Sequence, residues 1–268
     1  MRYRITLSSD QTQTIPINYQ YELSRLVNRT IKNGNPRLSR FIHGGGISFN
    51  RRQYRAFTFS RLWIPNRQIL NNRILIMPGE IKFVFSTPSL MIRDALYDGL
   101  LKRGPFRVGS AGFRVTAVED RAQPYFGHRA RFTTLSPVAL SKKKDFRRPL
   151  SGKNVKQTYL RPGDSFFNSF LKKSLENKYI AHRVARGEPL SKFKKPFYRS
   201  LIDHINIRGS PRPKLITIKE GTRQSYRVPC ALFEIELTGS PAIIEFAYDA
   251  GIGKHTSLGF GCLDTLSC

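Results

Sequence analysis

Apolar and polar positions alternate along the start of the chain, with Tyr3, Ile5 and Leu7 on one face. This period of two is typical of a half-buried strand. Further along, the apolar positions change to the 3/4 spacing of a helix, which the stretch 33–36 (Asn-Gly-Asn-Pro) is expected to end. A loop containing His43 should follow, so the chain begins with a strand and a helix.

In the rest of the first half, the apolar residues again follow either the strand period of two or the 3/4 spacing of a helix. A helix capped by Ser89 is expected through residue 102, because its apolar positions again recur at helical spacing. The predicted strands lie at residues 47–49, 56–63, 73–77, 80–86 and 106–118. The first half therefore predicts the order β-α-β-β-α-β with an added hairpin.

The second half repeats that order. Its strands are predicted at residues 131–140, 214–219, 226–237 and 260–266, one helix starts near residue 164, and another runs from Pro241 to Gly251. Two β-α-β-β-α-β units in tandem predict an α+β protein with two ferredoxin-like domains. We expect the first domain at residues 1–122, with His43, and the second at 123–268, with a glycine-rich segment.

The excess of basic residues predicts a negatively charged binding partner. The 268 residues contain 46 Lys and Arg against 18 Asp and Glu, a formal net charge of +28, while 40% of residues are hydrophobic and can form a core. Residues 23–79 alone contain eleven basic residues and no acidic one, with aromatic residues between them. Such a protein is expected to bind a nucleic acid, with steep salt dependence.

Several other classes are disfavoured. Cys230, Cys262 and Cys268 form no metal-ligand spacing and are odd in number, which argues against a zinc finger or a disulfide scaffold. The few carboxylates form no cluster for two metal ions, so no metal or cofactor is expected. No apolar run is long enough to cross a bilayer and no leader is evident, so we expect a cytoplasmic protein.

The most distinctive segment is residues 251–261, which contains four glycines between a helix and the last strand. Glycine allows a backbone to approach a phosphate closely and to adopt positive φ. The segment lacks the ending of a Walker loop and follows a helix, so neither a P-loop nor a dinucleotide fingerprint fits. The alternative interpretation is a tight turn required for packing.

This segment, Gly251-x-Gly253-x5-Gly259-Phe260-Gly261, resembles the glycine-rich loop of the repeat-associated RNA-binding superfamily of CRISPR systems. Within it, the chain is most similar to the endoribonucleases that process CRISPR repeat RNA, and the stretches 15–19, 41–43 and 57–60 agree. The resemblance covers nearly the whole chain and implies two ferredoxin-like domains.

The resemblance also implies a reaction and partners. Family members cut repeat RNA without a metal: the ribose 2′-OH attacks the scissile phosphate and leaves 2′,3′-cyclic phosphate and 5′-OH ends. The expected partners are precursor and mature guide RNA and other CRISPR effector subunits, with the protein itself a monomer or homodimer. A repeat-RNA binding subunit without catalysis is the main alternative, and a ribosomal RNA-binding protein is a weaker one.

Such a reaction needs groups that accept and donate protons. By the resemblance, His43 is the candidate general acid or base, because it lies where the family has its catalytic histidine, and His255 is its rival. The sequence departs from the family pattern at Asn28, where some members carry a catalytic tyrosine on the first helix. Tyr54 is the residue that could replace it.

Positive charge must also stabilise the phosphorane. By resemblance we assign this role to Arg55, which precedes the stretch 57–60, with Arg51, Arg52 and Lys254 as alternatives. The remaining predicted RNA contacts come from the basic segment 141–157 and from the glycine-rich segment: Lys142, Lys143, Lys144, Arg147, Arg148, Gly251, Gly253, Lys254, His255, Gly259 and Gly261.

Overall fold

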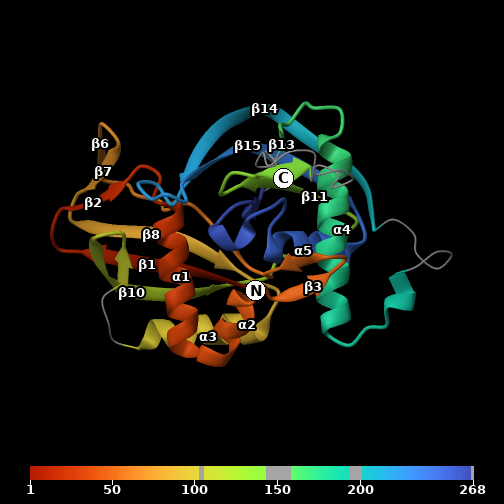
Figure 1. Ribbon diagram of the computed structural model, residues 1–268, viewed down its shortest axis with the longest axis horizontal. Coiled ribbons are helices and arrows are strands. Elements are labelled where there is room, and N and C mark those ends of the chain that lie inside the picture. Colours follow the sequence, from red (N-terminus) through yellow and green to blue (C-terminus); the bar gives the residue numbers. More distant parts are fainter. Residues whose placement is uncertain (103–105, 143–157, 194–200, 267–268) are drawn as a thin grey trace.

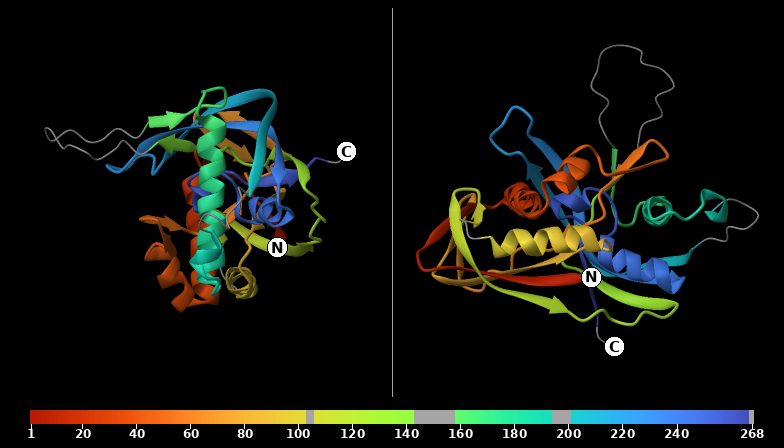
Figure 2. Two further views of the ribbon diagram at one scale, coloured as in Figure 1. Left: turned by 90° about the vertical axis from the view of Figure 1, so that its right-hand side faces the viewer. Right: turned by 90° about the horizontal axis from the view of Figure 1, so that it is seen from below.

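The computed structural model describes residues 1–102, 106–142, 158–193 and 201–266 (Figure 1). In the first half, five antiparallel strands form one sheet in the order β5-β8-β1-β10-β9. Helices α1 (Gln20–Gly34) and α3 (Leu90–Leu101) lie on one face of this sheet (Figure 2). Its strands are β1 (Arg2–Ser9), β5 (Thr58–Phe59), β8 (Gly79–Ser86), β9 (Phe106–Val108) and β10 (Ala111–Arg121).

The second half forms a four-stranded sheet in the order β14-β15-β11-β16. In chain order its elements are β11 (Arg129–Thr134), α4 (Phe167–Ala185), β14 (Ile202–Ile218), β15 (Tyr226–Gly239), α5 (Pro241–Ala250) and β16 (Leu263–Thr265). Counted within each half, both sheets have the strand order 2-3-1-4, if β9 is set aside as an added edge strand. This repeated topology confirms the prediction of two ferredoxin-like domains.

The described residues also form three small sheets and two short helical turns. The strands pair as β2-β7-β6, β3-β4 and β12-β13. Their bounds are β2 (Gln13–Pro16), β3 (Ile47–Phe49), β4 (Arg52–Tyr54), β6 (Arg67–Leu70), β7 (Arg73–Ile76), β12 (Leu140–Lys142) and β13 (Thr158–Leu160), and the turns are η1 (Leu190–Phe193) and η2 (Thr256–Leu258). Of these, the β3–β4 hairpin and η2 approach the site described below.

The segment before His43 is a helix, where the sequence predicted a loop. The Asn35 side chain accepts a hydrogen bond from the Leu38 N–H at 3.0 Å, and Pro36 occupies the first position of α2 (Pro36–His43). Asn-Pro therefore ends α1 and starts α2, because proline needs no N–H partner at a helix start. His43 is the last residue of α2 rather than a loop residue.

Several predicted strands are shorter or longer in the structure. The aromatic stretch 56–63 pairs only at Thr58–Phe59, and Trp63 forms an isolated bridge with Lys82. The stretch 106–118 is interrupted at Gly109, whose φ of 64° turns the chain between β9 and β10. The strand predicted at 214–219 is the end of the much longer β14, which arches beside β15 in Figure 1. Among the described residues, no helix is both long and apolar enough to cross a membrane.

Each half has its own hydrophobic core, and a buried arginine connects the two. Arg2 on β1 is 1% exposed and donates to the carbonyls of Tyr248 and Leu263, both at 2.7 Å. Its guanidinium also lies 3.5 Å from the centre of the Tyr248 ring, and Nη1 is 3.4 Å from Asp264 Oδ1. The first strand of one half is therefore joined to α5 and β16 of the other.

Candidate functional site

The β3–β4 hairpin presents basic side chains from the first half. Phe49 pairs with Arg52, so the turn contains only Asn50 and Arg51, with φ values of 48° and 56°. Two positive φ angles are typical of the type I′ turn that matches strand twist. Directly after the hairpin, Arg55 Nε donates to the Ile42 carbonyl at 2.9 Å, which holds the hairpin against the end of α2 that carries His43.

The glycine-rich segment of the second half is docked on the first. Thr58 Oγ1 donates to the Phe260 carbonyl at 2.9 Å, and Gln20 on α1 donates to the Gly259 carbonyl. Gly259 has a φ of 80°, and a Cβ there would lie 2.2 Å from Phe59 Cε2. Packing alone thus accounts for glycine at this position, as the tight-turn alternative expected.

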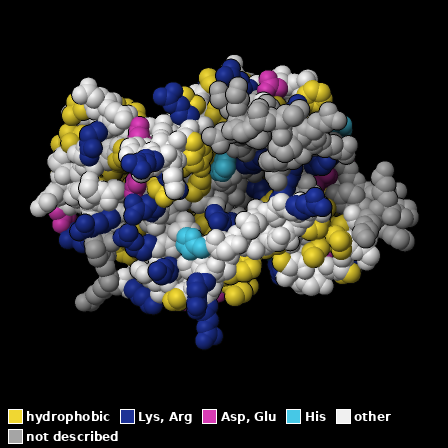
Figure 3. Space-filling model, in the orientation of Figure 1, with side chains coloured by type: hydrophobic (Ala, Val, Ile, Leu, Met, Phe, Trp, Pro, Cys, Tyr) yellow, Lys and Arg dark blue, Asp and Glu magenta, His cyan; other side chains and the backbone are white. Residues whose placement is uncertain are grey.

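A cleft of about 590 Å³ lies between these two segments, and α4 adds to its lining. The structure brings seven predicted site residues together in it: Arg51, Arg52, Tyr54, Arg55, Gly253, Lys254 and His255. Gly45, Ser48, Gln53, Ser174, Lys178, Thr256 and Ser257 complete the lining, which contains no Asp or Glu among the described residues. Figure 3 shows this face, where Lys and Arg side chains gather around a hollow. The cleft is suited to a polyanion.

His43 itself lies outside this lining. It is exposed at the end of α2, and the chain reaches the cleft two residues later, at Gly45. Of the four predicted glycines, only Gly253 lines the cleft. RNA contacts by all four glycines stay a prediction, and the three outside the lining, Gly251, Gly259 and Gly261, are buried.

The predicted basic segment is described only at its start. Lys142 Nζ lies 4.2 Å from the centre of the Phe166 ring and 5.3 Å from that of Phe170, a cation–π arrangement away from the cleft lining. The other four predicted contacts in this segment lie outside the described residues: Lys143, Lys144, Arg147 and Arg148.

The proton-transfer candidates in the cleft differ in their charge states. Burial, assisted by the nearby Lys254 charge, lowers the pKa of His255 to about 4, so its imidazole is neutral at pH 7. Burial raises the pKa of Tyr54 despite the opposing charge of Arg52, so Tyr54 remains a neutral phenol. A group with a pKa far below the working pH is a weak base, which disfavours His255 as the general acid or base.

Sequence reasoning missed Lys178 on α4. Its side chain is 6% exposed, and Nζ donates to the Gly251 carbonyl at 2.8 Å. The signal was present in the apolar stripe of α4, because Lys178 follows Ser174 by four positions and Leu175 by three. A lysine on the buried stripe of a helix is uncommon and indicates a special environment.

A second groove, of about 1050 Å³, is lined by residues of both halves. Trp63, which is 59% exposed, contributes to its wall together with apolar residues of β6 and β14. Its basic lining residues are Arg4, Arg61, Arg67, Lys82, Arg121 and Lys214. The groove thus combines an excess of positive charge over the single acidic residue of its described lining, Asp264, with an aromatic surface, and none of the predicted site residues that the structure describes lines it.

The fold and the cleft define a class of protein in which two tandem ferredoxin-like domains bring a basic hairpin and a glycine-rich loop together. The family model "CRISPR-associated protein Cas6, N-terminal" matches residues 14–119, and "CRISPR associated protein Cas6, C-terminal" matches residues 121–265. The chain therefore belongs to the Cas6 family of CRISPR-associated proteins, which confirms the resemblance read from its sequence.

Individual relatives agree along the whole chain. "CRISPR-associated endoribonuclease Cas6 1" of Methanocaldococcus jannaschii is 28% identical over 97% of this chain and 91% of its own length. "CRISPR-associated endoribonuclease Cas6" of Pyrococcus furiosus is 27% identical over 97% and 88%. A solved structure described as "CRISPR associated protein Cas6" has a TM-score of 0.75 at 25% identity and covers 100% of this chain and 99% of that one.

Proposed function

We propose that this protein is a metal-independent endoribonuclease that binds CRISPR repeat RNA and cuts it to produce mature guide RNAs. The observation that carries the proposal is the cleft, because it joins basic side chains from both halves of a Cas6-family chain and lacks acidic residues among its described lining. The relatives named as endoribonucleases support the same class of activity.

In the proposed reaction the ribose 2′-OH attacks the adjacent phosphorus, the bond to the 5′ oxygen breaks, and 2′,3′-cyclic phosphate and 5′-OH ends result. His43 transfers a proton as general acid or base, since its exposed position at the end of α2 leaves it accessible to RNA. The guanidinium of Arg55 stabilises the phosphorane. Tyr54 lies in the cleft and is the candidate replacement for the missing catalytic tyrosine, although its raised pKa makes the phenol a weak acid.

The experiment is cleavage of labelled repeat RNA in excess EDTA, followed by chemical analysis of the product ends. Wild-type protein should release a cyclic phosphate, and His43→Ala should lower the rate roughly 10² to 10⁴-fold while RNA binding persists. His204→Ala is the matched control, because His204 is an exposed histidine on β14. Loss of cleavage only in His255→Ala would move the catalytic histidine into the glycine-rich loop.

The second candidate is a repeat-RNA binding subunit that does not cut. Asn28 favours it, since an amide does not transfer protons at neutral pH and its Nδ2 is already bonded to the Ser24 carbonyl at 2.7 Å. Tight binding of repeat RNA without product, in EDTA and in magnesium alike, would select this function.

A further inference from the structure

Lys178 is a buried lysine whose charge has little to balance it among the described residues. It lies on α4, is 6% exposed, and lines the cleft beside the glycine-rich loop. An ammonium group has three N–H donors, and within the described residues Lys178 uses one, toward the Gly251 carbonyl. Buried charges in proteins are normally paired, so the two remaining donors need an explanation.

The described residues that line the cleft with Lys178 supply no anion. The hairpin contributes Arg51, Arg52 and the neutral Tyr54, and Arg55 follows it directly. The loop contributes Lys254 and the neutral His255, and α4 adds Ser174. The acidic residue of α4 is engaged elsewhere, since Glu176 accepts from the Leu201 N–H at 3.2 Å. On α5, Asp249 pairs with the amino group of Met1.

We infer that Lys178 is a phosphate ligand for RNA in the cleft, opposite the β3–β4 hairpin, and that RNA binding is accompanied by uptake of a proton on its amine. This inference rests on the proposed function and adds a contact from α4 that neither the family motifs nor the charge runs indicate. A phosphate oxygen would accept from the donors that the Gly251 carbonyl leaves unused.

The sign of the proton linkage follows from the environment of the amine. Burial lowers the pKa of Lys178 to about 7 in the RNA-free protein, and a bound phosphate would raise it again. Below pH 7 the amine is already charged and binds without uptake. Above pH 7 each binding event must first supply a proton, so affinity should fall by up to about tenfold per pH unit.

The experiment compares repeat-RNA affinity of wild-type protein, Lys178→Met, Lys178→Arg and the control Lys173→Met between pH 6 and 9 and across salt concentrations. Lys173 is an exposed lysine on the same helix. Lys178→Met should bind roughly tenfold more weakly at pH 6.5 and reduce the slope of log affinity against log salt by about 0.7, the share of one phosphate contact. Lys173→Met should change neither.

Lys178→Arg separates charge from protonation. Arginine stays charged throughout this range, so the variant should keep the salt slope and lose the pH dependence above pH 7. Proton uptake measured calorimetrically in buffers of different ionisation enthalpy should approach one proton in wild-type protein at pH 8 and vanish in both variants. If wild-type protein binds repeat RNA but shows no uptake, and both Lys178 variants match Lys173→Met, Lys178 only caps α5 and the inference is wrong. If wild-type protein binds no RNA, the proposed function itself fails.

Discussion

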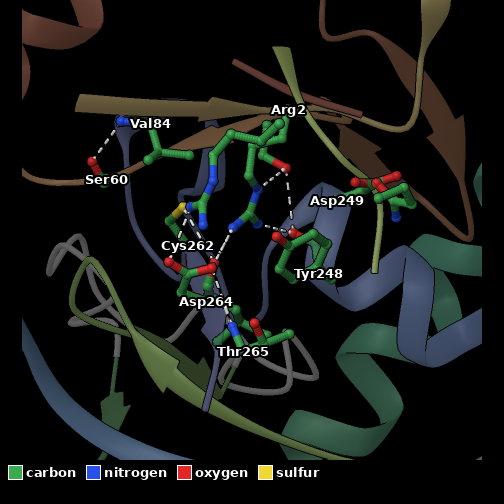
Figure 4. A network of polar contacts seen from close by, with 12 residues as sticks. Arg2, Ser60, Val84, Tyr248, Asp249, Cys262, Asp264 and Thr265 are labelled. Carbon is green, nitrogen blue, oxygen red and sulfur yellow. Dashed lines mark hydrogen bonds and ion pairs between the residues drawn. The ribbon is translucent and has the colours of Figure 1, made fainter. Parts of the chain in front are cut away.

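Replacing the buried Arg2 should lower the free energy of unfolding, because this side chain joins the two halves. In Arg2→Met the Leu263 carbonyl loses its arginine donor, the Tyr248 carbonyl keeps only the longer bond from Ser86 Oγ at 3.3 Å, and the Tyr248 ring loses its cation (Figure 4). Each buried acceptor left without a donor costs about 1 to 3 kcal/mol. Because methionine fills most of the volume, the polar loss dominates, and we expect a total of about 3 to 5 kcal/mol.

Arg4→Met is the matched control on the same strand. Arg4 pairs with Glu119 at 3.2 Å, but its side chain is 44% exposed, so its loss should cost less than about 1 kcal/mol. Thermal unfolding and urea denaturation measure both variants, and for a chain of this size 3 kcal/mol corresponds to a melting temperature lower by roughly 6 to 12 °C. Equal, small shifts in the two variants would refute the conclusion that Arg2 joins the halves.

Three further predictions concern the loop, the hairpin and the second sheet. Gly259→Ala should destabilise the protein by about 2 to 4 kcal/mol, because its Cβ meets Phe59. Its control in urea unfolding is Gly187→Ala, which should cost only about 1 kcal/mol because Gly187 has a φ of 92° but open space around its Cβ. Arg51→Gly should stabilise the protein by about 0.5 to 1 kcal/mol, because glycine adopts the positive φ of the turn without strain, and should weaken RNA binding. A loss of both stability and binding would contradict the turn assignment. Hydrogen bonds from three arginines lower the pKa of Glu236 to about 2, so its contribution to stability is present above pH 4.5 and disappears as the pH falls toward 2. The difference in melting temperature between wild-type protein and Glu236→Gln should therefore become smaller as the pH falls from 4.5 to 2.

Most of the fold can be predicted from the sequence, because the spacing of apolar residues indicates whether a segment is a strand or a helix and which of its faces is buried. The alternation of Tyr3, Ile5 and Leu7 predicts β1, and the pair Ser240-Pro241 predicts the start of α5. The period does not report where strands pair. Residues 56–63 carry the apolar pattern of a long strand, yet only Thr58–Phe59 has a ladder partner in β8.

Candidate site residues that lie in recognisable short stretches were predicted, whereas Lys178, which reaches the cleft only through long-range packing, was missed. The hairpin arginines and the glycine-rich loop are recognisable from short stretches, and the structure brings them to one cleft. Lys178 was not predicted because lysine is usually exposed to solvent, and its proximity to Gly251 arises from the packing of α4 against the loop. The signal in the sequence is the position of Lys178 on the buried stripe of α4, four residues after Ser174.

We propose that repeat RNA is held between the β3–β4 hairpin and the glycine-rich loop. The decisive experiment is photo-crosslinking of repeat RNA that carries a reactive base on either side of the scissile bond, followed by mass spectrometry. We predict cross-links to residues 47–55 and to residues 253–257 in the same complex. Cross-links confined to the second groove beside Trp63, with none in the cleft, would contradict the account.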